Sequence, residues 1–243
     1  MGRNLKEHAI LYDFYNHNIL KGQNDDIDYF IKLLDNINPK KILMVGAGTG
    51  RVAIPLSKIY KIDALDMDEK RLELLSEKCS DIKTIKADFI DFYTEEKYDV
   101  IIFPYSTLQY GNDMKKINDL IKKSGEIIDN NGYIIFDVSS SFENKSNENN
   151  KLLFTEHCDK LHDDVKVVYT AKKNKSHINF IVEYSLLSKK SKFYEVESYL
   201  YFDKEEYEKM VKHSGFDIIN VDDGYDGKSF KHKHIYLCRK NEL

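Results

Sequence analysis

The stretch Lys41-Ile42-Leu43-Met44-Val45-Gly46-Ala47-Gly48-Thr49-Gly50-Arg51 decides the fold of this 243-residue chain. Its first half is an apolar run that is too short for a buried helix and is bounded by a glycine, so it predicts a buried strand. Glycines at three alternate positions then let the backbone bend sharply and let a ligand approach main-chain atoms. A helix predicted over about residues 50–59 would point its unpaired N–H groups at this bend.

Strands and helices alternate on both sides of this segment. Apolar strands alternating with helices indicate a parallel sheet that is covered on both faces. Helical patterns precede the first strand within residues 5–35, and Pro39 ends them. The other expected strands are Ile62–Leu65, Ile82–Lys86, Val100–Phe103, Tyr133–Val138, Phe216–Val221 and Ile235–Arg239, and the other expected helices cover about 69–78, 114–128 and 203–213.

The pattern changes after residue 140. Ser139–Asn150 is rich in Ser, Asn and Glu and is expected to form a loop, and Asn130-Asn131-Gly132 is expected to stop the helix before it. From about residue 152 the apolar residues recur at every second position, and Asn174-Lys175-Ser176 predicts a hairpin turn. We therefore expect one domain made of residues 1–151 and 202–243, with an antiparallel β insertion of about four strands over 152–201.

Composition excludes several classes of protein. The chain is 42% hydrophobic and 32% charged, which rules out disorder as its main state. Its formal net charge of -4 offers no basic excess for nucleic acid. No stretch reaches the roughly 20 apolar residues of a membrane span. The three cysteines are scattered, which argues for a reducing compartment, and the charged N-terminus does not fit a signal peptide. We expect a cytoplasmic protein.

Several kinds of ligand fit a glycine-rich bend between a strand and a helix. A dinucleotide fingerprint requires a third glycine at position 51, where Arg51 stands, and a triphosphate loop requires a Gly-Lys-Ser/Thr sequence that is absent. A tight turn without a ligand is a further alternative. The spacing Gly46, Gly48, Gly50 instead resembles the first motif of S-adenosylmethionine-dependent methyltransferases of the Rossmann-like class.

Residues at the ends of the next two strands fit that cofactor. Asp66 ends the second strand, where a carboxylate can accept both ribose hydroxyls; its alternative role, capping the next helix, suits Asp68 better. Met67 can pack on adenine or in the core. Asp88 follows the third strand and can accept the adenine amino group, while Phe89 offers a face or an edge.

The resemblance extends over most of residues 10–240, with 140–200 loosely matched. Gly46–Leu56 resembles the GxGTGRxxxPL form of the class I methyltransferase signature, Phe103–Tyr110 is similar to the segment after strand four of the small-molecule type, and Gly132–Val138 is similar to strand five. This implies a three-layer α/β sandwich with a seven-stranded, mostly parallel sheet whose last strand is antiparallel. The expected cofactor-binding residues are Tyr15, Gly46, Ala47, Gly48, Arg51, Asp66, Met67, Asp88, Phe89 and Tyr105.

One departure from the family stands out. The family usually carries Asp or Glu two residues before the first motif glycine, where this chain has Met44. That carboxylate normally helps to orient the loop and the amino-acid end of the cofactor. The insertion resembles those of relatives that methylate amino-sugar nucleotides and other small metabolites, in which it covers the site or joins subunits. A small-molecule methyl acceptor and a homodimer through the insertion are the partners that this resemblance implies.

Methyl transfer from a sulfonium depends chiefly on alignment, because the methyl group is already activated. Tyr105 and Gln109 follow the fourth strand, beside the cofactor's reactive end in this fold, and are the first candidates for catalytic residues. Tyr15, on the N-terminal helix, is a third, with helix packing as an equal alternative. His232 and His234 alternate along a predicted strand and fit surface histidines better than a metal pair, so we expect no metal.

These observations predict a methyltransferase that uses S-adenosylmethionine to methylate nitrogen or oxygen of a small metabolite. Met44 and the large insertion leave a second hypothesis open. In that hypothesis the chain binds the cofactor without catalysis, as a regulatory or assembly protein.

Overall fold

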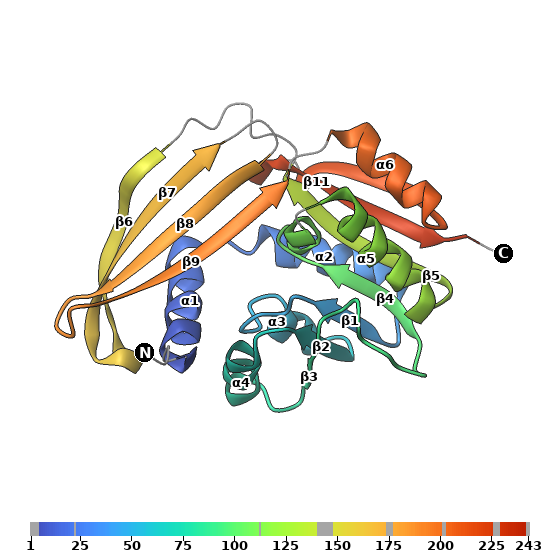
Figure 1. The fold of residues 1–243 in the computed structure, drawn as a ribbon. Coiled ribbons are helices and arrows are strands. Elements are labelled where there is room, and N and C mark those ends of the chain that lie inside the picture. Colours follow the sequence, from blue (N-terminus) through green and yellow to red (C-terminus); the bar gives the residue numbers. More distant parts are fainter. Residues whose placement is uncertain are drawn as a thin grey trace. The chain divides into compact units, whose positions relative to one another are not determined.

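The computed structural model describes residues 5–21, 23–111, 113–139, 148–173, 177–200, 203–225 and 229–241. The chain divides into two compact units (Figure 1). Unit 1 consists of residues 1–22 and 142–201, and unit 2 consists of residues 23–141 and 202–243. Unit 1 thus combines the antiparallel strands with the N-terminal helix, which the sequence-based division had left in the larger domain. The functional division into a methyltransferase domain and an insertion stays a prediction.

Unit 2 contains the predicted seven-stranded sheet. Its strand order is β10-β11-β5-β4-β1-β2-β3. The pairs from β5 to β3 are parallel, whereas β11 runs antiparallel to both β10 and β5, so the predicted fold class is confirmed. The strands are β1 (Ile42–Val45), β2 (Ile62–Asp66), β3 (Lys83–Lys86), β4 (Tyr98–Phe103), β5 (Ile128–Ser139), β10 (Phe216–Tyr225) and β11 (Ser229–Lys240).

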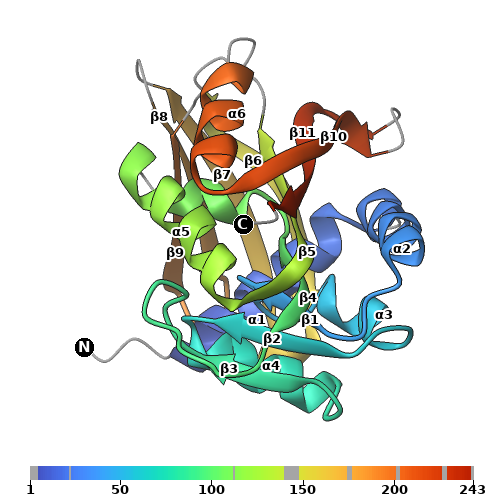
Figure 2. The same cartoon turned by 90° about the vertical axis from the view of Figure 1, so that its right-hand side faces the viewer.

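Helices cover both faces of this sheet (Figure 2). On one face, side chains of β1, β2 and β4 share a buried cluster with α2 (Asp25–Ile37), α3 (Ala53–Ser57) and α4 (Glu69–Lys78). On the other face lie α5 (Met114–Ile127) and α6 (Lys204–His213), and Tyr207 of α6 packs on Tyr236 of β11. All four residues of β1 are buried, as expected for the central strand of a doubly covered parallel sheet.

Three local predictions have clear outcomes in unit 2. Asp68 caps α4 as predicted, because its carboxylate accepts the N–H groups of Lys70 and Arg71. The helix after the glycine bend is shorter than predicted, since α3 begins only at Ala53. The prediction that Asn130-Asn131-Gly132 stops a helix is wrong, because α5 ends at Ile127 and these residues already belong to β5.

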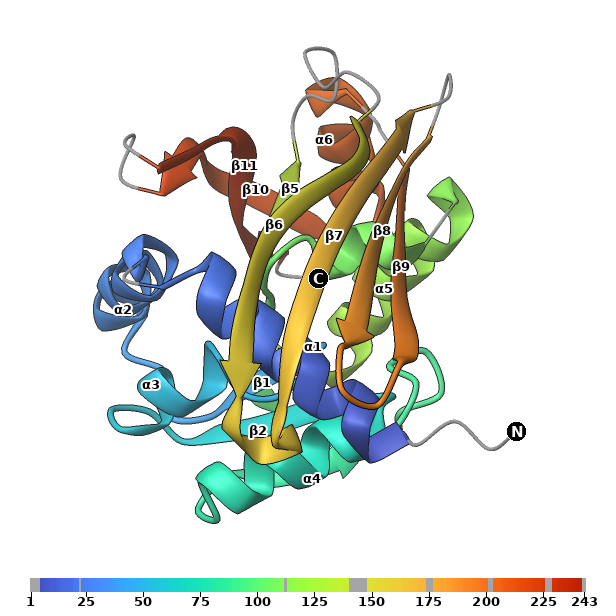
Figure 3. The same ribbon diagram turned by 90° about the vertical axis from the view of Figure 1, so that its left-hand side faces the viewer.

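Unit 1 is a four-stranded antiparallel sheet with one helix, which confirms the predicted type of the insertion (Figure 3). Its strands are β6 (Glu148–Cys158), β7 (Asp163–Lys173), β8 (His177–Leu186) and β9 (Ser191–Leu200). The helix α1 (Leu5–Ile19) packs on the sheet through rings, with Phe14 against Phe154 and Tyr15 against Tyr184. β6 begins inside the segment expected to be a loop, and the turn expected at 174–176 lies outside the described residues. None of the described helices combines the length and the apolar character needed to cross a membrane.

The cap of α6 can be tested by substitution. Asp203 accepts the N–H of Glu206, and the Glu206 carboxylate accepts the N–H of Asp203, which forms a capping box. Asp203→Ala is expected to lower the free energy of unfolding by about 1 kcal/mol, measured by urea denaturation. Asp203→Asn is the matched control, because asparagine caps helices about as well as aspartate. Equal losses in the two variants would contradict a capping role.

Candidate active site

The bend after β1 has a backbone that only glycine adopts easily. Gly46, Gly48 and Gly50 have φ values of +71°, +55° and +89°. A Cβ atom at Gly46 would lie 2.5 Å from Thr107 Cγ2, and one at Gly50 would lie 2.9 Å from Leu75 Cγ. The glycines therefore serve two purposes: they allow the left-handed backbone, and they let it pack against neighbouring elements.

Asp66 joins this bend to the end of β2. Its Oδ2 accepts the N–H of Gly48 at 2.7 Å, and its Oδ1 accepts the N–H of Asp68 at 2.9 Å. The Leu65 carbonyl also holds the bend, because it accepts hydrogen bonds from the N–H groups of Gly46 and Ala47. Each carboxylate oxygen has two lone pairs, so Asp66 retains the capacity to accept further hydroxyl donors. The acid and the glycine bend thus meet at the carboxyl edge of the sheet, where ligands bind in open α/β folds.

The residues predicted to surround adenine differ in exposure. Met67 is 67% exposed, so it does not serve as a core residue. Asp88 is exposed at the end of β3 and accepts the N–H of Ile90. Phe89 is buried against Phe103 in an edge-to-face contact with ring centroids 5.3 Å apart. Phe89 thus fixes the turn after β3, while Met67 and Asp88 present accessible groups.

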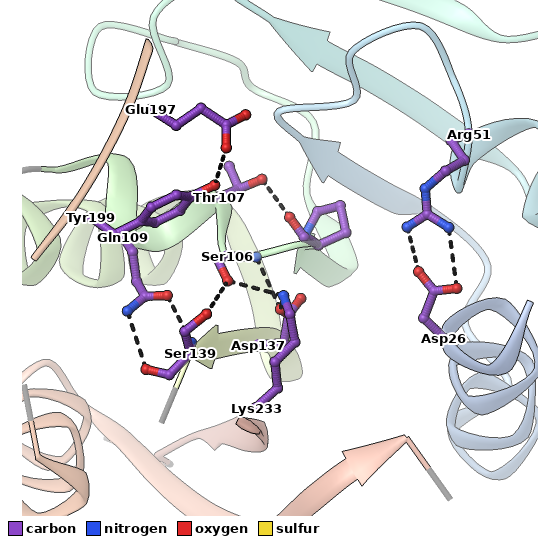
Figure 4. A network of polar contacts seen from close by, with 11 residues as sticks. Asp26, Arg51, Ser106, Thr107, Gln109, Asp137, Ser139, Glu197, Tyr199 and Lys233 are labelled. Carbon is purple, nitrogen blue, oxygen red and sulfur yellow. Dashed lines mark hydrogen bonds and ion pairs between the residues drawn. The ribbon is translucent and has the colours of Figure 1, made fainter. Parts of the chain in front are cut away.

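Position 44 offers no carboxylate, but another acid reaches the loop. Met44 is fully buried in the apolar cluster. Arg51, directly after the bend, forms a two-pronged ion pair with the buried Asp26 of α2 (Figure 4). Burial acts to lower the pKa of Arg51, but the hydrogen bond and charge of Asp26 outweigh it, so the pKa is raised and the guanidinium stays charged. This pair fixes the end of the loop to α2.

The segment after β4 is strained and is held by a second buried ion pair (Figure 4). Tyr105 and Ser106 have φ values of +56° and +62°, which are unfavourable for residues other than glycine. The Ser106 N–H donates to Asp137 Oδ2 at 2.9 Å, and Lys233 Nζ donates to Ser106 Oγ at 2.9 Å. Lys233 also pairs with Asp137, and both residues are buried. Strands β5 and β11 thereby set the conformation of the segment.

The ring of Tyr105 lies within reach of two cations. Lys233 Nζ is 4.5 Å and Arg51 Cζ is 5.1 Å from the ring centroid, both within the range of cation–π attraction. Tyr105 therefore connects the ion pair after β1 to the ion pair after β4. Tyr105 and Arg51 were predicted from the sequence as site residues, whereas Asp26, Asp137 and Lys233 were not. For Asp137, the sequence offered one indication of a role, which is a charged residue within an otherwise apolar part of strand β5.

Two predicted catalytic residues have different surroundings. Gln109 lies in the short helix η1 (Thr107–Gly111) and is buried, and its Oε1 accepts the N–H of Ser139 at 2.7 Å. This contact favours a role in holding η1 to β5. Tyr15 belongs to unit 1, where burial and then the negative charge of Glu197 raise the pKa of its phenol. Tyr15 is therefore a neutral phenol, and its catalytic role stays a prediction.

Metal chemistry has no evident site in the described part of the chain. No group of three or more His, Cys, Asp or Glu side chains there is arranged to hold an ion. The polar groups at the carboxyl edge of the sheet are instead a backbone bend, carboxylates and an aromatic ring.

Comparison with known proteins agrees with this geometry. Residues 42–132 match the family model described as a methyltransferase domain. This part of the chain is thus a methyltransferase domain by sequence. No curated protein matches the chain in sequence.

Solved structures share the fold of this methyltransferase at low sequence identity. An S-adenosylmethionine-dependent methyltransferase from Clostridium acetobutylicum is 17% identical, with a TM-score of 0.79 over 95% of this chain and 98% of that one. The sugar N-methyltransferase KedS8 from a Streptoalloteichus species is 13% identical, with a TM-score of 0.78 over 95% and 93%. DesVI from Streptomyces venezuelae is 16% identical, with a TM-score of 0.74 over 94% and 97%.

The buried Lys233–Asp137 pair gives a stability prediction. Lys233→Met should lower the free energy of unfolding by about 3–5 kcal/mol, because it leaves the Asp137 charge buried without a counter-charge. In the double variant Lys233→Met/Asp137→Asn the buried charge is absent, while the amide oxygen still accepts from Ser106. Urea denaturation should show that the double variant recovers most of the loss. A double variant as unstable as the sum of both single variants would contradict the electrostatic explanation.

Proposed function

We propose that this methyltransferase methylates a small metabolite at nitrogen or oxygen, and that the amino group of an amino sugar is the preferred class of acceptor. The observation that carries the proposal is the glycine bend hydrogen-bonded to Asp66 at the sheet edge. Fold neighbours support the acceptor class, since they include the sugar N-methyltransferase KedS8 and CalS10, an amino pentose methyltransferase from Micromonospora echinaspora.

The residues at this edge fit the chemistry of the cofactor. A Cβ atom at Gly46 would lie 2.5 Å from Thr107 Cγ2, so only glycine lets the bend pack this closely against the segment after β4. In our proposal Gly46, Ala47 and Gly48 line the methionine part, and Asp66 accepts the ribose hydroxyls. Met67 covers adenine, Asp88 accepts its amino group, and Phe89 supports that turn. Arg51, Tyr105 and Tyr15 complete the proposed set.

S-adenosylmethionine supplies an activated methyl group on a sulfonium, which leaves alignment as the main task of the protein. Orientation of reactants can contribute about 7–11 kcal/mol to lowering a barrier. We propose that Tyr105 performs this task after β4, because its ring is fixed by Arg51 and Lys233 and its backbone by Asp137. Gln109 maintains the segment through Ser139. Tyr15 is proposed as a further phenol at the acceptor.

Cofactor binding gives the first test. Asp66→Ala removes the proposed acceptor of two ribose hydroxyls, each hydrogen bond to a charged group contributing about 1.5–3 kcal/mol, so affinity for S-adenosylmethionine should fall by at least about tenfold. Isothermal titration calorimetry measures this change. The control is Asp91→Ala, an exposed carboxylate a short distance along the chain. An Asp66→Ala isotherm identical to that of the unmodified protein would contradict the assignment.

The alternative function, a regulatory or assembly protein that binds the cofactor without catalysis, is favoured by Met44 in place of the usual acid. Incubation with labelled S-adenosylmethionine and a panel of amino sugars, amines, phenols and alcohols separates the two functions. We expect label in an amino sugar product, and less of it with the Asp66→Ala variant at the same cofactor concentration. Tight cofactor binding without transfer to any acceptor would favour the alternative.

Three further expectations from sequence stay predictions. They are a homodimer formed through residues 152–201, a cytoplasmic location and the lack of a nucleic-acid partner.

A further inference from the structure

In the middle of strand β9, two acidic residues occupy the buried face of the sheet, and an aromatic and an apolar residue occupy the exposed face. Its register with β8 pairs Phe193 with Tyr184, Glu195 with Val182 and Glu197 with Phe180, and these β8 residues are all buried. Directly paired residues lie on the same face of a sheet, so Glu195 and Glu197 lie on its buried face. The intervening Tyr194 and Val196 are 52% and 62% exposed. Carboxylates at inward positions cost free energy, and such violations of the pattern are expected at functional sites.

Aromatic rings surround the two carboxylates on this face. Phe180, the partner of Glu197, stacks on Tyr169 with centroids 5.7 Å apart and meets Tyr199 edge-to-face at 5.5 Å. One pair further along the sheet, Tyr184 meets Tyr15 of α1 at 6.1 Å. The face thus combines negative charge with several π systems, and both attract a positive charge.

The polar contacts show how the carboxylates are held. Glu197 accepts the hydroxyl of Tyr199 at 2.7 Å, and Glu195 Oε2 lies 3.2 Å from His8 Nε2. Burial raises the pKa of Tyr184, and the negative charge of Glu195 raises it further, so the Tyr184 phenol is neutral.

The side-chain hydroxyl of Tyr184 is buried without a hydrogen-bond partner in the described part of the chain. Tyr184 is completely buried, and its Oη has no hydrogen-bond partner among the residues that the structure describes. An unpaired buried hydroxyl costs about 1–3 kcal/mol, so such groups normally have a partner or await one. The unpaired hydroxyl therefore indicates that a polar ligand binds beside the two carboxylates.

We infer that the face of the unit 1 sheet around Glu195, Glu197 and Tyr184 binds an organic ammonium group. Two carboxylates two residues apart on one face repel each other, and a cation relieves this repulsion, whereas a neutral alcohol does not. The rings add cation–π attraction, and the Tyr184 hydroxyl accepts an N–H. One part of the inference rests on the proposed function, namely that this ammonium group belongs to the methyl acceptor.

The test uses two pairs of probes that differ in charge. The full chain is titrated at pH 7 with glucosamine and N-acetylglucosamine, and with benzylamine and benzyl alcohol, in the presence of S-adenosylhomocysteine. Binding is followed by saturation-transfer NMR. In each pair the amine should bind at least about tenfold more tightly than its neutral partner, as expected for a charge-assisted contact. Glu197→Gln should abolish this preference, since it removes the charge and keeps the shape.

Glu183→Gln is the matched control. Glu183 lies on β8 at an outward position, where it accepts hydrogen bonds from Lys192 and Tyr194, so its loss should leave the preference unchanged. Calorimetric binding of S-adenosylhomocysteine to each variant verifies folding and tests the cofactor site separately. Equal binding of amines and neutral partners, no binding of either amine, or a preference that survives in folded Glu197→Gln would overturn the inference. If the unmodified chain does not bind S-adenosylhomocysteine, the proposed function is overturned instead.

Discussion

The hydrogen bond from the Gly48 N–H to the Asp66 carboxylate is the contact on which the site depends. It connects the first loop of the sheet to the end of the neighbouring strand, and the backbone at Gly48 lies in the left-handed region, with a φ of +55°. A Cβ atom at Gly46 or Gly50 would collide with Thr107 or Leu75. The bend therefore cannot be replaced by ordinary turn residues, and it leaves main-chain atoms and a carboxylate together at the edge where this fold binds ligands.

Two ion pairs, each with a buried acid, extend that arrangement across unit 2. Buried pairs are weak evidence for stability, because desolvation offsets most of the attraction, and their best-supported use is to specify one conformation. Asp26–Arg51 fixes the chain after the glycine bend, and Lys233–Asp137 fixes the strained segment at Tyr105. The Tyr105 ring lies near both cations, so its position depends on both pairs. We interpret these pairs as the means by which unit 2 keeps an unfavourable backbone in place.

Sequence patterns predicted the fold because each pattern reports on local burial. The apolar run at 42–45 and the cap at Asp68 act within a few residues, and they form as predicted. The bend and Asp66 could be anticipated because strand order brings consecutive strand ends together. The pair of Asp137 and Lys233 could not, since it depends on the register of β11 against β5, which the sequence does not specify. The start of β5 was missed because Asn and Gly at 130–132 are typical of a turn, whereas β4 pairs with Ile128 and again from Tyr133, with an irregularity between them.

The buried face of β9 also could not be predicted from its own sequence. Alternation along a strand predicts which face is buried only when apolar residues occupy that face, and the apolar Val196 lies on the exposed face of β9. Register with β8 resolves this, because the partners of Glu195 and Glu197 are the buried Val182 and Phe180. Cross-strand pairing thus overrides the local pattern and forces two acids inward. A strand that tolerates this arrangement in a small sheet keeps charge where a hydrophobic residue would be more stable, which is characteristic of recognition rather than of packing.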